Sequence, residues 1–136
     1  MGVFYVDCRV VNIAERDKSA HIQELIVDTG SEFTWLPADV LAGIGIMVEK
    51  SAQKFTMANG ETIVRDIAYA ILSVDGFQSV DEVVFAQAGD LSLLGSHTLE
   101  GFGAVVDARK KQLVAAGSFL AAVSSASFNC AMIECT

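Results

Sequence analysis

The feature that most constrains this chain is the run 25–31, which reads Leu-Ile-Val-Asp-Thr-Gly-Ser. Its apolar residues predict a buried β-strand, and Asp28, Thr29 and Gly30 follow that strand directly. Burying a lone carboxylate is costly unless it is paired or shares a proton, so an acid at the end of a core strand indicates a chemical role. Two such carboxylates, held side by side and sharing one proton, would supply that role. The chain has one Asp-Thr-Gly, so under this interpretation the second carboxylate comes from another copy of the chain.

A purely structural interpretation of the same tripeptide stays open at this point. Glycine next to a small polar residue often marks a plain turn between two strands. Thr29 and Gly30 would then be turn residues with no catalytic part. The surrounding sequence has to decide between the two interpretations.

Length and hydropathy predict one domain that associates with a copy of itself. A chain of 136 residues forms a single modest core, and its apolar fraction of 52% is high for a soluble monomer. No run approaches the roughly 18 to 20 apolar residues that span a bilayer, and the first residues lack the pattern of a secretory signal. We therefore expect no membrane partner, and we expect the surplus hydrophobicity to be buried in a homodimer interface.

Charge and cysteine content narrow the possible partners and cofactors. The net charge is −8, so a nucleic-acid partner is not expected, because phosphate backbones are bound through Lys and Arg. Cys8, Cys130 and Cys135 cannot all pair within one chain, which favours a reducing, cytoplasmic location, although a bridge between the last two stays open. His21 and His97 have no nearby ligand pattern, so we expect neither a metal nor another cofactor.

Short apolar runs separated by turn residues predict an all-β fold over residues 1–115. Pro37 is expected to begin a short helix that ends at Gly43, and Ser96 to N-cap a second helix over 96–100. Asn59-Gly60 predicts a tight hairpin turn, because both residues tolerate positive φ. We expect strands at 3–13, 21–27, 33–36, 54–57, 62–64, 67–74, 77–85, 91–94, 104–107 and 112–114. Residues 116–136 form a C-terminal tail for which a helix, a dimerising strand and a frayed end all stay open.

With these elements in this order, residues 3 to 114 resemble the retropepsin-like aspartic proteases, which are single-domain and dimeric. The run 25–31 is similar to the family's active-site loop, and the hairpin 57–62 lies in the position of its flap. Leu-Leu-Gly at 93–95, followed by a short helix, is similar to the segment that passes beside that loop. The helix after the loop, at 36–41, also fits. The resemblance implies an all-β fold, a closed acid-protease barrel with one or two short helices.

The resemblance also implies which residues form the site. In each protomer Asp28 would be catalytic, with Thr29 and Gly30 supporting the active-site loop. The residues implied in substrate binding are Ser31, Glu32 and Phe33 in the cleft and Ala58, Asn59 and Gly60 at the flap tip. A charged surface turn remains an equal interpretation of Glu32. Trp35, the sole tryptophan, is interpreted as core or interface packing.

The function implied by the resemblance is an aspartic endopeptidase that cleaves a peptide or protein substrate as a homodimer. The alternative is a dimeric peptide-binding or scaffold domain of the same fold that has weak or no proteolysis, since fold does not settle function. An ATPase of the actin and sugar-kinase type also carries an Asp-x-Gly-Ser/Thr loop, but its two large α/β domains do not fit this chain. The hairpin from Phe55 to Val64 is predicted to be mobile without a bound peptide.

Overall fold

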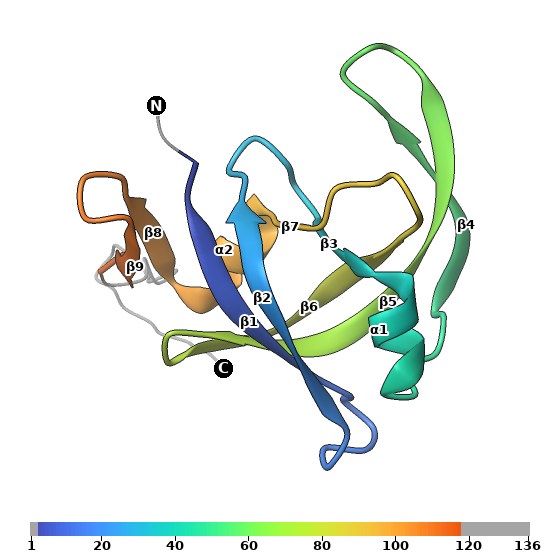
Figure 1. Ribbon diagram of the computed structural model, residues 1–136, viewed down its shortest axis with the longest axis horizontal. Helices are drawn as coiled ribbons and strands as arrows, with labels where there is room; N and C mark the ends of the chain where they lie inside the picture. Colours follow the sequence, from blue (N-terminus) through green and yellow to red (C-terminus); the bar gives the residue numbers. More distant parts are fainter. Residues whose placement is uncertain (1–2, 118–136) are drawn as a thin grey trace, which may run out of the picture.

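The computed structural model describes residues 3–117, and this part is built mainly of β-strands (Figure 1). The predicted all-β class is therefore confirmed. The elements are β1 Tyr5–Val11, β2 Ser19–Val27, β3 Thr34–Pro37, α1 Ala38–Gly43, β4 Lys50–Thr56, β5 Thr62–Val74, β6 Phe77–Ala86, β7 Leu93–Leu94, α2 Ser96–Phe102, β8 Ala104–Asp107 and β9 Gln112–Ala115. The predictions for 118–136 and for Cys130 and Cys135 lie outside the described residues.

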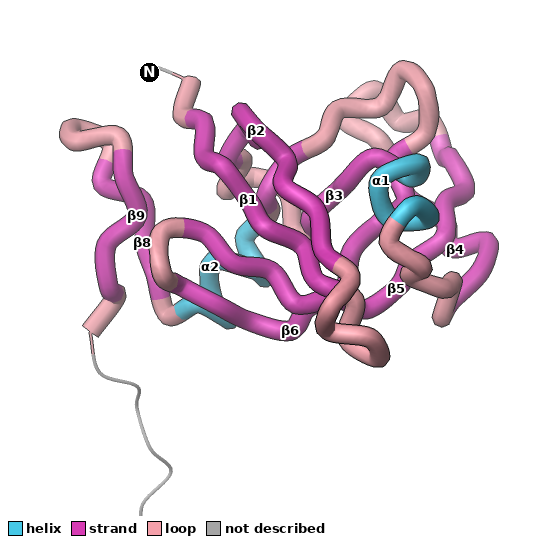
Figure 2. Tube along the Cα trace, turned by 60° about the horizontal axis from the view of Figure 1, so that its bottom comes forward, coloured by secondary structure: helices cyan, strands magenta, loops and turns pink. Residues whose placement is uncertain are grey.

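Seven of the strands form one strongly curved sheet, with the order β1-β2-β7-β3-β6-β5-β4. β1 also pairs antiparallel with β5, so the sheet bends far enough to bring these two strands together (Figure 2). β8 and β9 form a separate antiparallel hairpin that follows α2. No helix within residues 3–117 is long and apolar enough to cross a membrane.

The main core fills the inside of this curved sheet. β1 alternates exposed and buried residues, as expected for a strand with one face on the core. Fully buried side chains from β1, β2, β3 and β5, among them Val10, Leu25, Leu36 and Leu72, meet in one cluster. Trp35 belongs to a second, smaller cluster with Ile67, Val84, Ala86 and Leu93. The interpretation of Trp35 as a packing residue is confirmed, since it is buried.

Most predicted strand ends differ from the structure by one to four residues, and three differences concern whole elements or helix caps. The expected strands at 62–64 and 67–74 are one continuous strand, β5, because its first half pairs with β4 and its second half with β6. Pro37 ends β3 and is the N-cap residue of α1, which begins one residue later than predicted. The N-cap residue of α2 is Gly95, and Ser96 is already the first helical residue.

Candidate active site

The active-site loop joins β2 to β3 and is fixed on one side by β7. β2 and β7 pair in parallel, with Ile26 opposite Leu93 and Val27 opposite Leu94. The pairing continues into the loop, where the backbone N–H of Asp28 donates to the carbonyl of Leu94 at 2.9 Å. The prediction that 93–95 passes beside this loop is confirmed. Asp28 is thereby held at the end of a core strand.

The loop turns sharply around the carboxylate of Asp28. Oδ1 of Asp28 accepts a hydrogen bond from the N–H of Gly30 at 3.0 Å, and the carbonyl of Asp28 accepts one from Ser31 N–H at 3.1 Å. A Cβ added at Gly30 would lie 3.3 Å from Oδ1 of Asp28, so only glycine fits this turn without a shift. The expectation of a buried carboxylate is wrong for the single chain, because Asp28, Thr29 and Gly30 are all exposed to solvent.

The start of α2 supports the loop from the other side. The N–H groups of Ser96 and His97 donate to the carbonyls of Ser31 and Glu32, at 2.7 and 3.0 Å. The backbones approach so closely that a Cβ added at Gly95 would lie 2.3 Å from the carbonyl oxygen of Phe33. The glycine of the Leu-Leu-Gly run is therefore required by packing.

A buried chain of hydroxyls lies under the loop, and the sequence analysis missed it. The N–H of Gly95 donates to Oγ1 of Thr34 at 2.9 Å, and this hydroxyl lies 2.6 Å from Oγ1 of Thr98. Thr98 donates in turn to Oδ2 of Asp81 at 2.8 Å, so the Thr34 hydroxyl is the donor to Thr98. Both threonines are completely buried. The available sequence signal was a pair of threonines inside otherwise apolar or helical segments.

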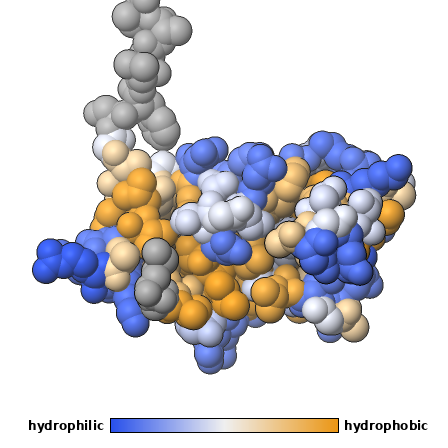
Figure 3. Space-filling model, turned by 90° about the horizontal axis from the view of Figure 1, so that it is seen from above, coloured by the Kyte–Doolittle hydropathy of each residue, from blue (hydrophilic) through white to orange (hydrophobic). Residues whose placement is uncertain are grey.

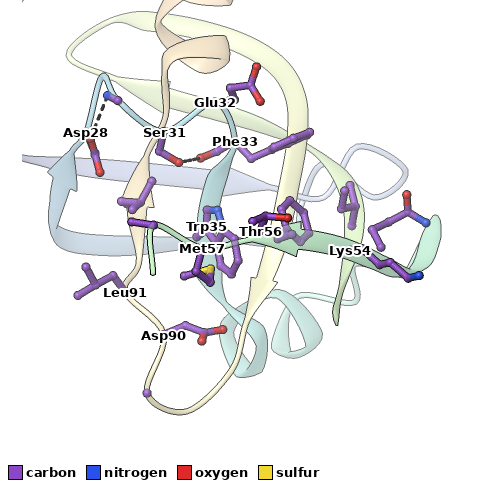
Figure 4. A pocket seen from close by; sticks show the side chains of 17 residues that line it. Asp28, Ser31, Glu32, Phe33, Trp35, Lys54, Thr56, Met57, Asp90 and Leu91 are labelled. Carbon is purple, nitrogen blue, oxygen red and sulfur yellow. Dashed lines mark hydrogen bonds between the residues drawn. The ribbon is translucent and has the colours of Figure 1, made fainter. Parts of the chain in front are cut away.

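An open cleft of about 800 Å³ lies beside Asp28 (Figure 4). It is lined by parts of the active-site loop, β3, β4, the hairpin tip and the segment before β7: Asp28, Gly30, Ser31, Glu32, Phe33, Trp35, Gln53, Lys54, Phe55, Thr56, Met57, Ala58, Ile67, Gly89, Asp90, Leu91 and Leu93. Six of the nine residues predicted for the site therefore line one cleft. Thr29, Asn59 and Gly60 do not line it in the single chain.

Aromatic side chains form the apolar part of the cleft. Phe55 of β4 packs edge-on against Phe33, with ring centroids 5.5 Å apart, and against Trp35 at 5.1 Å. These contacts join the hairpin β4–β5 to the active-site loop and to β3. The aromatic part of the cleft wall is suited to bind apolar side chains of a ligand.

A tight turn at the tip of the β4–β5 hairpin contains Asn59 and Gly60, as predicted. The N–H of Gly60 donates to the carbonyl of Met57 at 2.9 Å, which closes a four-residue turn over 57–60. Gly60 has a φ of +88°, whereas Asn59, which would tolerate a positive φ, does not adopt one. Asn59 serves the turn through its side chain, whose Oδ1 accepts the N–H of Glu61 at 2.9 Å. The tip is therefore stabilised by its own polar groups.

A bidentate ion pair joins β5 to the segment between β6 and β7. Nε and Nη2 of Arg65 donate to Oδ2 and Oδ1 of Asp90, at 2.6 and 2.8 Å, and both side chains are largely buried. Arg65 holds the pKa of Asp90 below its usual value. The stabilising contribution of the pair is therefore present above the ordinary pKa of an aspartate, and it is lost only as the pH falls through the lowered value.

The comparison with known families agrees with this geometry. A sequence model described as gag-polyprotein putative aspartyl protease matches residues 18–101, which is more than half of the chain. The chain therefore belongs to this retropepsin-like family. The matched region runs from β2 through the active-site loop and the β4–β5 hairpin to α2. The family indicates a protease of the aspartyl class.

No curated protein matches the chain. Within residues 3–117 no three His, Cys, Asp or Glu side chains gather as metal ligands.

Proposed function

We propose that this protein is an aspartic endopeptidase that acts as a homodimer, with Asp28 of each protomer forming one half of the catalytic pair. The observation that carries the proposal is the state of Asp28 in the single chain. Its carboxylate is exposed beside an open cleft, and Gly30 holds one of its oxygens. Such a carboxylate is oriented by its own loop and is accessible to a second carboxylate from a partner.

The chemistry of the pair follows from the proximity of two like charges. Two carboxylates a few ångström apart cannot both ionise cheaply, so they titrate as a coupled pair that shares one proton. The ionised member takes a proton from a water molecule, whose oxygen attacks the carbonyl carbon of the peptide. The protonated member gives its proton to the carbonyl oxygen. When the tetrahedral intermediate collapses, the C–N bond breaks, the leaving amine takes the proton that the first carboxylate removed from water, and the second carboxylate takes back a hydroxyl proton of the intermediate.

Exposed apolar residues near Asp28 support the dimer. Tyr5, which pairs with Ile26 in the register of β1 and β2, is 50% exposed, and Val3 before it is 56% exposed. Figure 3 views the molecule from the end that carries the active-site loop, and apolar residues gather in the left and central part of this face. A two-fold axis through this end would bury them and bring both copies of Asp28 together. The β1–β5 pairing supports the closed barrel of the family.

The proposal is tested by a peptide-cleavage assay at acid pH with the inhibitor pepstatin. Asp28→Asn should lower kcat by several orders of magnitude, because the acid and base functions are lost together. Asp75→Asn is the matched control, since it makes the same change at an exposed turn residue between β5 and β6. The control should cleave at the wild-type rate. Cleavage by purified Asp28→Asn protein at the wild-type rate would contradict the mechanism.

Mixed dimers test whether the two carboxylates come from two chains. Wild-type chains refolded with an excess of Asp28→Asn chains should lose activity, because most wild-type chains would then be paired with an inactive partner. A single-chain active site predicts no such loss. The alternative function, a dimeric peptide-binding or scaffold domain, predicts a dimer that binds peptide but cleaves none, whatever residue occupies position 28.

A further inference from the structure

The β6–β7 loop, residues 87–92, forms one wall of the cleft and has little packing behind it. Leu91 lines the cleft and is 67% exposed. A second hollow, of about 490 Å³, lies on another side of the same loop and is bordered by Gln87, Ala88, Gly89, Asp90 and Ser92. Gly89 and Asp90 border both spaces. The loop therefore separates two open spaces, and buried apolar contacts cannot fix its position.

Hydrogen bonds of Asp90 take the place of that packing. Within the loop, Oδ2 of Asp90 accepts the N–H of Gln87 at 2.9 Å, and the N–H of Asp90 donates to the carbonyl of Gln87 at 2.9 Å. These bonds shape the loop but do not attach it to anything else. Among the described residues, only the two hydrogen bonds from Arg65 join the loop to a segment distant in sequence.

Arg65 lies where β5 leaves the base of the flap hairpin, opposite Gln53 of β4. Its Nη1 donates to the carbonyl of Val64 at 2.8 Å, so all three guanidinium nitrogens are engaged. A planar guanidinium with two parallel bonds to a carboxylate fixes orientation as well as distance. The loop is thereby attached to the flap strand in one defined geometry.

We propose that Arg65 and Asp90 are positioning residues for substrate binding, holding Leu91 as a wall of the cleft at a fixed distance from the flap. The proposal deepens the proposed function and rests on it. Neither side chain is required to touch the reacting atoms. Their effect is on the shape of the cleft, and thus on the affinity for a peptide that fills it with an apolar side chain.

Steady-state kinetics on the peptide that the wild-type protein cleaves provide the first test. Asp90→Asn keeps the size of the side chain but weakens the bidentate pair with Arg65. It should raise KM about tenfold and change kcat by no more than about twofold. The reason is that the contacts between the peptide and the cleft wall are lost equally in the ground state and in the transition state. Arg65→Lys keeps the positive charge but removes the planar guanidinium that makes two parallel hydrogen bonds, and it should raise KM as well. Glu82→Gln is the control, because it breaks the Lys50–Glu82 pair, which does not line the cleft.

A second measurement needs no catalysis and separates this proposal from the proposed function. The N–H groups of Gln87 and Asp90 donate hydrogen bonds within the loop, and their exchange, corrected for the intrinsic rate of each sequence, should be at least tenfold faster in Asp90→Asn than in the wild-type protein and unchanged in Glu82→Gln. If the wild-type protein cleaves no peptide but exchange rises as stated, the proposed function fails and the attachment of the loop stands. Unchanged exchange in Asp90→Asn, or a loss of kcat with KM unaltered, would overturn the positioning role.

Discussion

Replacing Thr98 with valine should destabilise the fold through the buried hydroxyl chain under the active-site loop. Valine has nearly the same shape but can neither accept the hydrogen bond from Thr34 nor donate to Asp81. The lost bond to a carboxylate corresponds to about 1.5–3 kcal/mol, and the lost bond between hydroxyls to about 1 kcal/mol. The added methyl group in the core offsets about 0.8 kcal/mol. The free energy of unfolding should fall by about 2–3 kcal/mol.

Urea unfolding followed by the fluorescence of Trp35, the sole tryptophan, measures this loss. The midpoint should fall with an unchanged m-value, which would show that the native and denatured states keep their compactness. Thr98→Ser is the matched control, since it keeps both hydrogen bonds and removes one buried methyl group, at about 1 kcal/mol. A double-mutant cycle with Thr34→Val should give a coupling of about 1 kcal/mol. If Thr98→Val is no less stable than Thr98→Ser, the reasoning about the hydroxyl chain is refuted.

Two further predictions concern the loop and the flap. Gly95→Ala should lower the free energy of unfolding by more than about 2 kcal/mol, because its Cβ would meet the backbone of Phe33. Gly76→Ala is the control, because Gly76 has open space around it and the substitution adds only the strain of a positive φ. Equal losses of stability in the two variants would contradict the close approach at Gly95. The amides of Ala58–Glu61 should exchange much faster than those of β2 in the free protein and slow down when pepstatin binds, as measured by hydrogen exchange. Protection equal to that of β2, unaltered by inhibitor, would show that this hairpin is no flap.

The sequence predicted the parts of the site that depend on local residue order. The apolar run before Asp28 predicted a strand that ends at this residue, and Gly76 marked the turn between β5 and β6. The single strand β5 was divided in the prediction because Arg65 and Asp66 resemble a break in an apolar run. In the structure they continue the ladder, since Arg65 pairs with β4 and Asp66 accepts the N–H of Ala52 in a bulge of that strand.

The contacts that hold the site together could not be predicted in this way. Thr34 and Thr98 are 64 residues apart, and Arg65 and Asp90 are 25 residues apart. Neither pair has a characteristic spacing, because each arises only when two strands or loops meet in the folded molecule. The contacts of Phe55 with Phe33 and Trp35, at the base of the hairpin predicted to be mobile, also join residues distant in sequence.

The exposure of Asp28 changes where the energetic cost of its charge falls. The sequence argument assumed that one chain buries the carboxylate, but in the structure it is exposed and hydrogen-bonded to Gly30, so it imposes little cost on the fold. In the proposed dimer, the cost arises when two such carboxylates approach each other and lose water. Asp28→Asn should therefore leave the free energy of unfolding of the single chain nearly unchanged and make the dimer dissociate less. Sedimentation equilibrium at neutral pH, where the pair carries more charge than at acid pH, measures this difference. A weaker dimer in the variant would contradict a shared site at the two-fold axis.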